Sequence, residues 1–421
     1  MTKVHKYLRS VNFSTLLLWD IKRYFATQVL SSFPLVRLGD YINEESAKYS
    51  ISDPNKTYGI LGVNNQNGIF DAYEESGSKI KQKYKKMEVG WIAYNPYRVN
   101  VGSIGKRTNE HKYEYISPAY VVFSCKNGLL PDFLFLLMKT DLFNKIIREN
   151  TTGSVRQNLN FTILSNLQIP LPSLEEQNAI VTAYNNSLAL AQQYEQQAIA
   201  EEKNIQQYIS QQLGFLTKNK ENSTPKTLMY FKNLSELSVR WDVWNIAQSL
   251  YGGAHELIAL SKVIRLSSGQ FLPAKSQIDG PYNVYGGNGK TGTHNKFCYS
   301  GKRIVIGRVG EYCGNVHLVD GEYWVTDNAL KVDKIYDGIT WEYLAIALEA
   351  LNINQYKSVS AQPSISQSKI LQLQIPLPPL DVQNEIVEHI SKLKEQIKLL
   401  RALAADTRNA AIQKFEQTIF E

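Results

Sequence analysis

The stretch Leu167-Gln-Ile-Pro-Leu-Pro-Ser-Leu-Glu-Glu-Gln-Asn-Ala-Ile-Val181 returns almost unchanged as Leu373-Gln-Ile-Pro-Leu-Pro-Pro-Leu-Asp-Val-Gln-Asn-Glu-Ile-Val387. The two copies lie 373 − 167 = 206 residues apart, and each opens a long helical pattern. A period of this length indicates duplicated domains rather than a solenoid of short repeats. We therefore expect a pseudo-symmetric chain, with two similar modules joined by two similar helices.

The prolines in each copy mark the point where a helix can begin. Proline fixes φ and lacks a backbone N–H, so no helix passes through Ile-Pro-Leu-Pro. Acidic residues follow in the first turn, where the helix dipole favours negative charge: Glu175 and Glu176 in one copy, Asp381 in the other. We expect helices over about 174–213 and 380–420.

Apolar residues along both predicted helices recur at spacings of three and four, which is the pattern of a heptad seam. The seam residues are Val181, Tyr184, Leu188, Ala191, Ala198, Ile205 and Ile209, then Ile386, Ile390, Leu393, Ile397, Leu400, Ala404 and Ala411. Helices this polar and rich in glutamine would be marginal alone, so they must pair. We expect an antiparallel pair within the chain, with 218–226 as the linker that turns the chain back; a parallel homodimer through each helix is the alternative.

Further matches precede the helices. Trp19-Asp20 and Trp241-Asp242 are each followed 19 residues later by a leucine, Leu38 and Leu260. Farther on, Val99–Gly105 aligns with Ile304–Gly310.

Both modules alternate short β-type runs with loops rich in glycine and asparagine, then end in a helix, which is typical of mixed α+β domains. The expected strands are Tyr58–Val63, Val89–Tyr94, Tyr120–Ser124, Ile304–Gly307, Val316–Val319 and Ala329–Val332, and the helices are 131–150 and 340–351. We predict an α+β fold, in which two pseudo-symmetric mixed α/β domains are separated by two long antiparallel coiled-coil helices. The expected division is 1–165 and 221–371 for the domains, and 166–220 and 372–421 for the helices.

Composition narrows the class of protein. A chain of 421 residues with net charge +7 has a mild basic excess, which is compatible with nucleic-acid binding. Its three cysteines are too few and too scattered for a disulfide frame or a zinc cluster, and we interpret them as reduced thiols. No signal peptide or 18-residue apolar run is found, so we expect a cytoplasmic protein without membrane association.

Several strings resemble catalytic motifs without completing them. Tyr94-Asn-Pro-Tyr97 lacks the second proline of the adenine methyltransferase motif, and no glycine-rich cofactor loop precedes it. Gly286-Gly-Asn-Gly-Lys-Thr291 lacks the earlier glycine of a phosphate loop and is better interpreted as a turn. The histidines have no metal-ligand spacing. We therefore predict no catalytic residue, no metal site and no cofactor in this chain.

Basic and amide side chains gather in the loops of both modules. Lysine and arginine contact phosphates or guanine, and asparagine and glutamine pair with adenine, through hydrogen bonds. The DNA-binding candidates are Lys81, Lys83, Lys85, Arg98, Lys106, Arg107, Arg156, Gln157, Lys275, Asn288, Lys290, His294, Arg308 and Gln362. For the run Lys79–Lys86, a solvent-exposed edge strand without a DNA contact is an equally good interpretation. Any single candidate taken alone is more simply explained as an ordinary surface residue.

The repeated Ile-Pro-Leu-Pro segments resemble the conserved regions of type I restriction–modification specificity subunits. Tyr285-Gly-Gly-Asn-Gly289, Ile306-Gly-Arg-Val-Gly-Glu-Tyr-Cys-Gly-Asn-Val316 and Trp324-Val-Thr-Asp-Asn-Ala329 resemble one subtype of target-recognition domain in that family. Tyr94–Gly105 and Ser154-Val-Arg-Gln-Asn-Leu159 resemble another. The resemblance covers nearly the whole chain in the family's usual order.

The resemblance implies a non-catalytic subunit that binds double-stranded DNA at one bipartite, asymmetric site. Each target-recognition domain would read one half-site, and the helices would set the spacer. Partners would be two adenine-N6 methyltransferase subunits and, in a restricting system, two motor–endonuclease subunits, with S-adenosylmethionine, ATP and Mg²⁺ in those partners. The conserved regions would serve as scaffold or partner-binding sites through Pro170, Pro172, Gln177, Pro376, Pro378 and Gln383.

Two other functions stay open. The chain could be a stand-alone methyltransferase or nuclease, which methyl transfer by the purified chain would reveal. It could also be a coiled-coil spacer protein, which failure to bind DNA even with partners would favour.

Overall fold

A computed structural model gives the fold, and it describes residues 27, 29–99, 102–150, 158–214, 253, 255–358 and 362–421. The chain divides into two compact units. Unit 1 comprises the described residues of Met1–Gln193 with Leu403–Glu421, and unit 2 those of Tyr194–Ala402. The twin tryptophan-aspartate pairs and the linker 218–226 lie outside the described residues.

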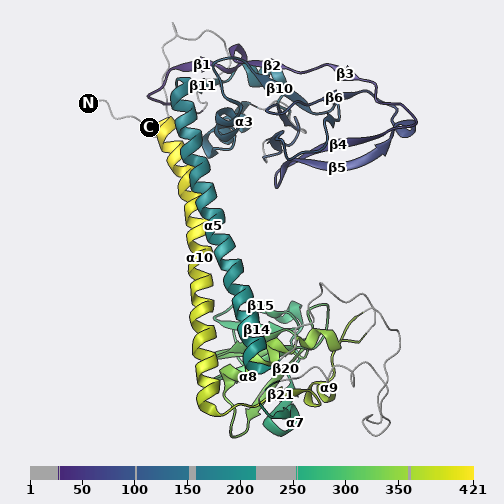
Figure 1. The fold of residues 1–421 in the computed structure, drawn as a ribbon, viewed down its shortest axis with the longest axis vertical. Coiled ribbons are helices and arrows are strands. Elements are labelled where there is room, and N and C mark those ends of the chain that lie inside the picture. The colour runs from purple at the N-terminus through teal and green to yellow at the C-terminus, as the bar shows by residue number, and fades with distance from the viewer. Residues whose placement is uncertain are drawn as a thin grey trace. The chain divides into compact units, whose positions relative to one another are not determined.

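Unit 1 contains a five-stranded sheet in the order β3-β6-β9-β4-β5 and a four-stranded sheet in the order β2-β10-β7-β8 (Figure 1). Helices and short 3-10 turns complete it. The bounds are β1 Leu35–Arg37, η2 Leu38–Asp40, β2 Ile42–Glu44, β3 Lys48–Tyr49, β4 Thr57–Asn64, β5 Gly68–Ser76, η3 Gly77–Lys79, β6 Tyr84–Lys86, β7 Ile92–Tyr94, β8 Ile104–Lys106, β9 Tyr115–Ile116, β10 Val121–Cys125, α2 Pro131–Leu137, α3 Asp141–Asn150, α4 Phe161–Ser165, β11 Gln168–Pro170 and α5 Leu174–Leu213.

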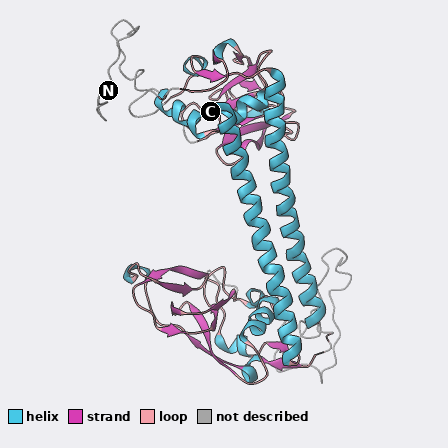
Figure 2. Ribbon diagram, turned by 90° about the vertical axis from the view of Figure 1, so that its left-hand side faces the viewer, coloured by secondary structure: helices cyan, strands magenta, loops and turns pink. Residues whose placement is uncertain are grey.

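Unit 2 contains two four-stranded sheets, in the orders β13-β20-β17-β18 and β15-β14-β19-β16. Figure 2 distinguishes these strands from the helices beside them. The bounds are β12 Leu257–Ala259, α7 Leu260–Val263, β13 Ile264–Ser268, η7 Ala274–Ser276, β14 Tyr282–Gly286, β15 Gly289–His294, β16 Tyr299–Ser300, β17 Arg303–Gly307, β18 Val316–Val319, β19 Glu322–Val325, β20 Ala329–Ile335, α8 Trp341–Ala350, η8 Ile353–Tyr356, α9 Gln367–Leu371, β21 Gln374–Pro376 and α10 Leu380–Phe420.

The predicted mixed α/β modules are therefore confirmed, with two local corrections. The strand expected over Val89–Tyr94 begins only at Ile92, because Val89 and Gly90 form a turn in which Gly90 has a φ of 87°. The single helix expected over 131–150 is two helices, α2 and α3. Thr140 ends the first and caps the second: its hydroxyl donates to Leu137 O at 2.7 Å and accepts from Phe143 N at 3.2 Å. This side chain competes for backbone groups that a continuous helix would use, so the chain turns here.

The duplication is visible in backbone hydrogen bonds. β1 pairs antiparallel with β11, and β12 pairs antiparallel with β21. Next to these ribbons, Leu38 N donates to Leu167 O at 2.9 Å, and Leu260 N donates to Leu373 O at 2.8 Å. Both predicted equivalent leucines, Leu38 and Leu260, are fully buried. Each Ile-Pro-Leu-Pro segment thus closes its unit through a short two-stranded ribbon.

The predicted alignment of Gly102 with Gly307 is wrong. Asn95 N donates to Ser103 O, and Gly307 N donates to Asn315 O, so this loop has an offset of 307 − 95 = 212 residues. Gly102 then matches Gly314, and both have positive φ, 84° and 93°. The alignment failed because it matched similar glycine-containing stretches by residue type. The offset between the two modules is 212 residues in this loop but 206 in the Ile-Pro-Leu-Pro repeat, so the strands around the loop do not align at a single offset.

The long helices α5 and α10 have the predicted bounds, and each contributes to both units: α5 belongs to unit 2 from Tyr194 onward, and α10 belongs to unit 1 from Leu403 onward. Within each unit the two helices pair antiparallel. In unit 1, Tyr184 meets Phe415, with ring centroids 6.4 Å apart. In unit 2, Tyr208 stacks on His389 at 4.2 Å, and Arg401 Nη2 pairs with Glu202 Oε1 at 2.8 Å. Every residue of the predicted seam is buried or half-buried, which confirms the intramolecular pair. None of the helices described could cross a membrane.

Candidate nucleic-acid interface

Unit 2 has a polar hollow of about 280 Å³ built from four separate loops. Two of the predicted base readers, Asn288 and Gln362, line it together. The hairpin between β14 and β15 supplies Asn288, and the segment before α9 supplies Gln362. The remaining lining residues are Gly287, Val309, Gly310, Glu311, Tyr312 and Asn328. The hollow therefore brings three side-chain amides to one place.

Glycines allow these loops to approach one another. A Cβ on Gly307 would lie 2.1 Å from Gly287 O, and one on Gly287 would lie 2.5 Å from Val309 O. Gly289 adopts φ +82° and closes the hairpin with Gly286. The turn predicted for the string around Gly286–Thr291 is therefore confirmed.

Sequence reasoning did not select Asn328, Glu311 or Tyr312, which also line the hollow. Tyr312 is 53% exposed although large and aromatic. Asn328 lies in the stretch Trp324–Ala329 and Tyr312 in the stretch Ile306–Val316, and the family resemblance of these two stretches was the signal available for them. A side-chain amide both donates and accepts hydrogen bonds, whereas a carboxylate only accepts them. The amides and the carboxylate that line the hollow therefore suit direct hydrogen bonding to base edges.

Three basic candidates lie on the surface of unit 2. Lys275 and Lys290 are exposed, and Arg308 is half-buried. Arg308 Nη1 donates to Ser268 Oγ at 3.3 Å, and the Arg308 backbone carbonyl accepts from Ile365 N at 2.9 Å. These contacts hold the arginine beside the hollow, since Val309 and Gly310 follow it in the chain.

His294 occupies a different environment. It is 6% exposed, its Nδ1 accepts from Ile278 N at 3.1 Å, and its ring packs edge-on against Trp324 at 5.4 Å. An imidazole enclosed in this way supports the fold of the loop, so we correct its assignment from DNA contact to packing. The tertiary neighbours that enclose it come from elsewhere in the chain and left no local signal.

In unit 1, Lys81 and Lys83 are exposed in the loop before β6. The edge-strand alternative for this run is wrong, because β6 lies between β3 and β9. Lys85 is 5% exposed and its Nζ donates to Tyr120 O at 2.9 Å; burial lowers its pKa. We therefore remove Lys85 from the phosphate-contact set and keep the two exposed lysines.

Of the other basic candidates in unit 1, one is exposed and two are bonded to neighbouring groups. Arg98 is exposed beside Tyr97, which is 56% exposed. By contrast, Lys106 forms an ion pair with Asp132, and Arg107 Nη1 donates to Met87 O at 2.7 Å. Lys106 and Arg107 are thus engaged in holding β8 and its neighbours. The candidates Arg156 and Gln157 lie outside the described residues.

The methyltransferase-like string has a structural role. Tyr94 is fully buried in the core of unit 1, and burial raises the pKa of its phenol. Asn95 Oδ1 accepts from Tyr97 N at 3.0 Å, which shapes the turn after β7. Among the residues described, no group of three or more histidine, cysteine or acidic side chains is placed to hold a metal ion.

The scaffold candidates lie at matching places in the two units. Pro170, Pro172, Pro376 and Pro378 are buried. Gln177 and Gln383 are fully buried, and the amide of each bonds to backbone groups of its own unit.

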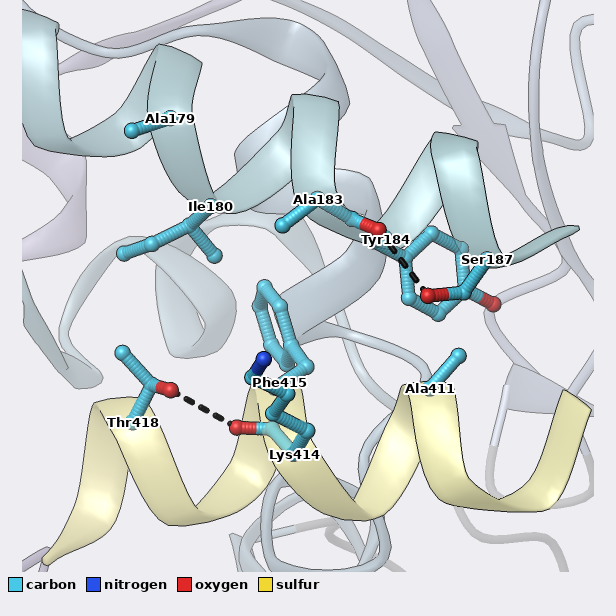
Figure 3. A pocket seen from close by; sticks show the side chains of 9 residues that line it. All are labelled: Ala179, Ile180, Ala183, Tyr184, Ser187, Ala411, Lys414, Phe415 and Thr418. Carbon is cyan, nitrogen blue, oxygen red and sulfur yellow. Dashed lines mark hydrogen bonds between the residues drawn. The ribbon is translucent and has the colours of Figure 1, made fainter. Parts of the chain in front are cut away.

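A groove of about 270 Å³ runs between α5 and α10 in unit 1 (Figure 3). Its apolar wall includes Ile180, Ala183 and Phe415, with Lys414 at the rim. By the 206-residue offset, Ala183 and Lys414 correspond to His389 and Tyr208, whose rings stack in unit 2. The groove of unit 1 therefore exists where the aromatic pair of unit 2 is replaced by a small and a flexible side chain.

Comparison with known proteins agrees with this architecture. The family model described as type I restriction modification DNA specificity domain matches residues 33–207 and 258–406. The type I restriction enzyme EcoprrI specificity subunit of Escherichia coli is 31% identical over 138 residues. That alignment covers 32% of this chain and 34% of the relative, so it spans about a third of the relative's length.

A similar fold is found in a solved structure of low sequence identity. A chain from a structural study of complex assembly and conformational transition in the type I R-M system has a TM-score of 0.59 and 16% identity, with 93% of this chain and 97% of the other covered. The HsdS subunit from Thermoanaerobacter tengcongensis has a TM-score of 0.48 and 15% identity, with coverage of 93% and 98%.

Proposed function

Because the chain belongs to the family of type I restriction–modification DNA specificity domains, we propose that it is the DNA-recognition subunit of a type I complex. Each unit reads one half of a bipartite, asymmetric double-stranded site. The observation that carries this proposal is the duplicated frame of ribbons and helices, which bears different polar loops in its two copies. A single frame with two unlike recognition surfaces suits a site with two unlike halves.

In unit 2, base reading is assigned to the polar hollow. Asn288 and Gln362 present amides, which pair with the N6 and N7 edge of adenine. Arg308, Lys275 and Lys290 supply positive charge, which contacts phosphates or guanine and orients the duplex. The close approach of glycines there brings the backbone loops together without intervening side chains.

In unit 1, the exposed basic side chains Lys81, Lys83 and Arg98 take the corresponding roles. Lysine charge adds salt-dependent affinity without sequence information. Tyr97, exposed beside Arg98, offers an aromatic face against the sugar-phosphate edge or a base. The two units thus rely on different side chains, so their half-sites are unrelated.

The paired helices set the unread spacer. Their antiparallel seam is apolar, and its residues are buried or half-buried within each unit. A continuous α-helix lengthens by about 1.5 Å per residue, so the number of residues sets its length. Insertion of a heptad into both helices is expected to change the preferred spacer and leave both half-sites intact. A methylation map with unchanged spacing would contradict the role of the helices.

The chemistry belongs to the partners in this proposal. Two adenine-N6 methyltransferase subunits carry S-adenosylmethionine and extract the target base from the duplex. In a restricting system, two motor–endonuclease subunits add ATP and Mg²⁺. The chain itself supplies recognition and docking, without catalysis, and acts in the cytoplasm where chromosomal DNA lies.

The test is a genome-wide map of N6-methyladenine by single-molecule sequencing, in cells that express the chain with its neighbouring methyltransferase gene. The expected result is a bipartite motif that disappears when the chain is deleted. Paired Asn288→Ala and Gln362→Ala substitutions should then alter one half only. The matched control is Asn295→Ala, an exposed amide of the same unit outside the hollow.

Two outcomes would overturn the proposal. Methyl transfer by the purified chain alone would make it an enzyme. A reconstituted complex that methylates DNA without dependence on this chain would leave it as a spacer protein.

A further inference from the structure

One buried glutamine in each unit connects the recognition domain to the start of its long helix. In unit 1, Gln177 on α5 is fully buried. Its Oε1 accepts from Leu130 N at 2.8 Å, and its Nε2 donates to Gly128 O and Pro172 O, both at 2.9 Å. Gly128 and Leu130 lie in the loop between β10 and α2.

Unit 2 repeats the same three hydrogen bonds to the backbone and adds a longer one of 3.5 Å from Thr340 Oγ1 to Gln383 Oε1. Gln383 on α10 is fully buried, and its Oε1 accepts from Thr340 N at 3.0 Å. Its Nε2 donates to Gly338 O at 2.7 Å and to Pro378 O at 2.9 Å. Gly338 and Thr340 lie in the loop between β20 and α8. The matching strands β10 and β20 occupy equivalent positions in the two four-stranded sheets.

The arrangement requires a primary amide of this length. The two N–H groups of the amide are both used, and its oxygen accepts from the residue that precedes a helix. Glutamate offers no donor and would place a buried charge against two carbonyls, while asparagine is one methylene too short to reach all three partners. Both loop glycines adopt positive φ, 97° and 92°, which turns their carbonyls toward the amide.

The three partners of each glutamine belong to two different parts of its unit. Two are in the loop that joins the recognition sheet to its helix, and one is in the proline-rich lead of the long helix. The loop and the proline-rich lead are therefore both bonded to one planar amide group, which is buried. A side chain that bonds two elements at once limits their relative rotation more than apolar packing does, because hydrogen bonds are directional.

We propose that Gln177 and Gln383 are positioning residues for DNA reading, each of which fixes the angle between its recognition domain and its own segment of long helix. This inference rests on the proposed function. Its consequence is that each glutamine sharpens the choice of spacer without contacting DNA. Loss of one glutamine leaves the base readers intact and allows the half-site of that unit to shift.

The first experiment measures spacer choice. Complexes of the full chain with its methyltransferase subunits are presented with a library in which both half-sites are constant and the spacer varies by one or two base pairs. Gln383→Met, which keeps the length of the side chain and removes all hydrogen bonds of the amide, is expected to raise methylation at neighbouring spacers about tenfold relative to the preferred one. Half-site bases should stay unchanged.

A control separates positioning from stability. Ile346→Val on α8 deletes one buried methyl group in the same unit and touches none of the three bonds. It should lower overall methylation at most, with the same spacer profile as the original chain. A profile that is narrow in Gln383→Met, or equally broad in the control, overturns the inference.

A second measurement does not depend on DNA reading. Spin labels at Lys290 and Glu388, both exposed and both in unit 2, report the angle between recognition domain and helix in a background with the three cysteines replaced by alanine. Gln383→Met should broaden the distance distribution, while an unchanged distribution refutes positioning. If broadening occurs and no bipartite methylation exists in the original chain, the proposed function fails and the positioning role stands.

Discussion

Replacement of Phe415 by alanine should strongly destabilise the first unit, although this residue lies close to the C-terminus of α10. Phe415 is 3% exposed and packs in the core of unit 1. Its ring lies 5.9 Å from that of Phe133 and 6.4 Å from that of Tyr184, between centroids. The two partners come from α2 and α5, so the substitution removes a contact among three helices.

The expected loss is large. Truncation of a buried phenylalanine to alanine costs about 3–5 kcal/mol in lost transfer free energy and cavity formation. A domain is stabilised by about 5–15 kcal/mol in total, so unit 1 would lose at least about a fifth of its stability. Phe415→Leu, which retains most of the apolar volume, should cost less than half as much.

The assay is urea unfolding combined with hydrogen exchange read separately for each unit. The matched control is Ile209→Ala, the position equivalent by the 206-residue offset, which is 6% exposed in the core of unit 2. Phe415→Ala should increase exchange in α2 and the first half of α5, and Ile209→Ala should increase it in unit 2. A cost below about 1 kcal/mol, or faster exchange confined to unit 2, would refute the antiparallel return of α10.

Three further predictions concern single residues. Hydrogen bonds from Ser173 hold the pKa of the Glu176 carboxyl below its usual value. These bonds therefore stabilise the fold fully at pH values above the ordinary glutamate pKa, and their contribution is lost as pH falls through the pKa that Glu176 has in the folded protein. Ser173→Ala removes the hydroxyl bond to this carboxylate and also the bond that the hydroxyl accepts from Glu176 N, so it should lower the urea midpoint more at about pH 7 than at about pH 2. Equal effects at both pH values would contradict the contribution of the carboxylate. Gly314→Ala should destabilise the chain by more than Gly310→Ala, because both have positive φ but only the first places a Cβ 2.5 Å from a backbone nitrogen of η8; equal thermal midpoints would count against the clash. Lys83→Ala should reduce the slope of log affinity against log salt by about 0.9 in DNA-binding titrations, whereas an unchanged slope would remove Lys83 from the phosphate contacts.

The sequence alone determined the features that arise from local pattern. The repeat at an offset of 206 residues located both proline-rich leads, and the spacing of apolar residues after them located α5 and α10. Helix periodicity and proline geometry act over a few residues, so they are readable without a partner. The glycine string before Thr291 was likewise interpretable as a turn, because φ above zero is a property of single residues.

Only the tertiary structure decided which polar side chains are available. Lys85 and His294 are buried by neighbours from other strands and loops, while Asn288, Asn328 and Gln362 meet because four distant loops converge. The equivalence of Gly102 with Gly314 could be recognised only from the hydrogen bonds between strands. The hydrogen bonds of each buried glutamine likewise could not be inferred from the identity of the residue. Burial and convergence depend on contacts across tens to hundreds of residues, and no local pattern in a single sequence encodes them.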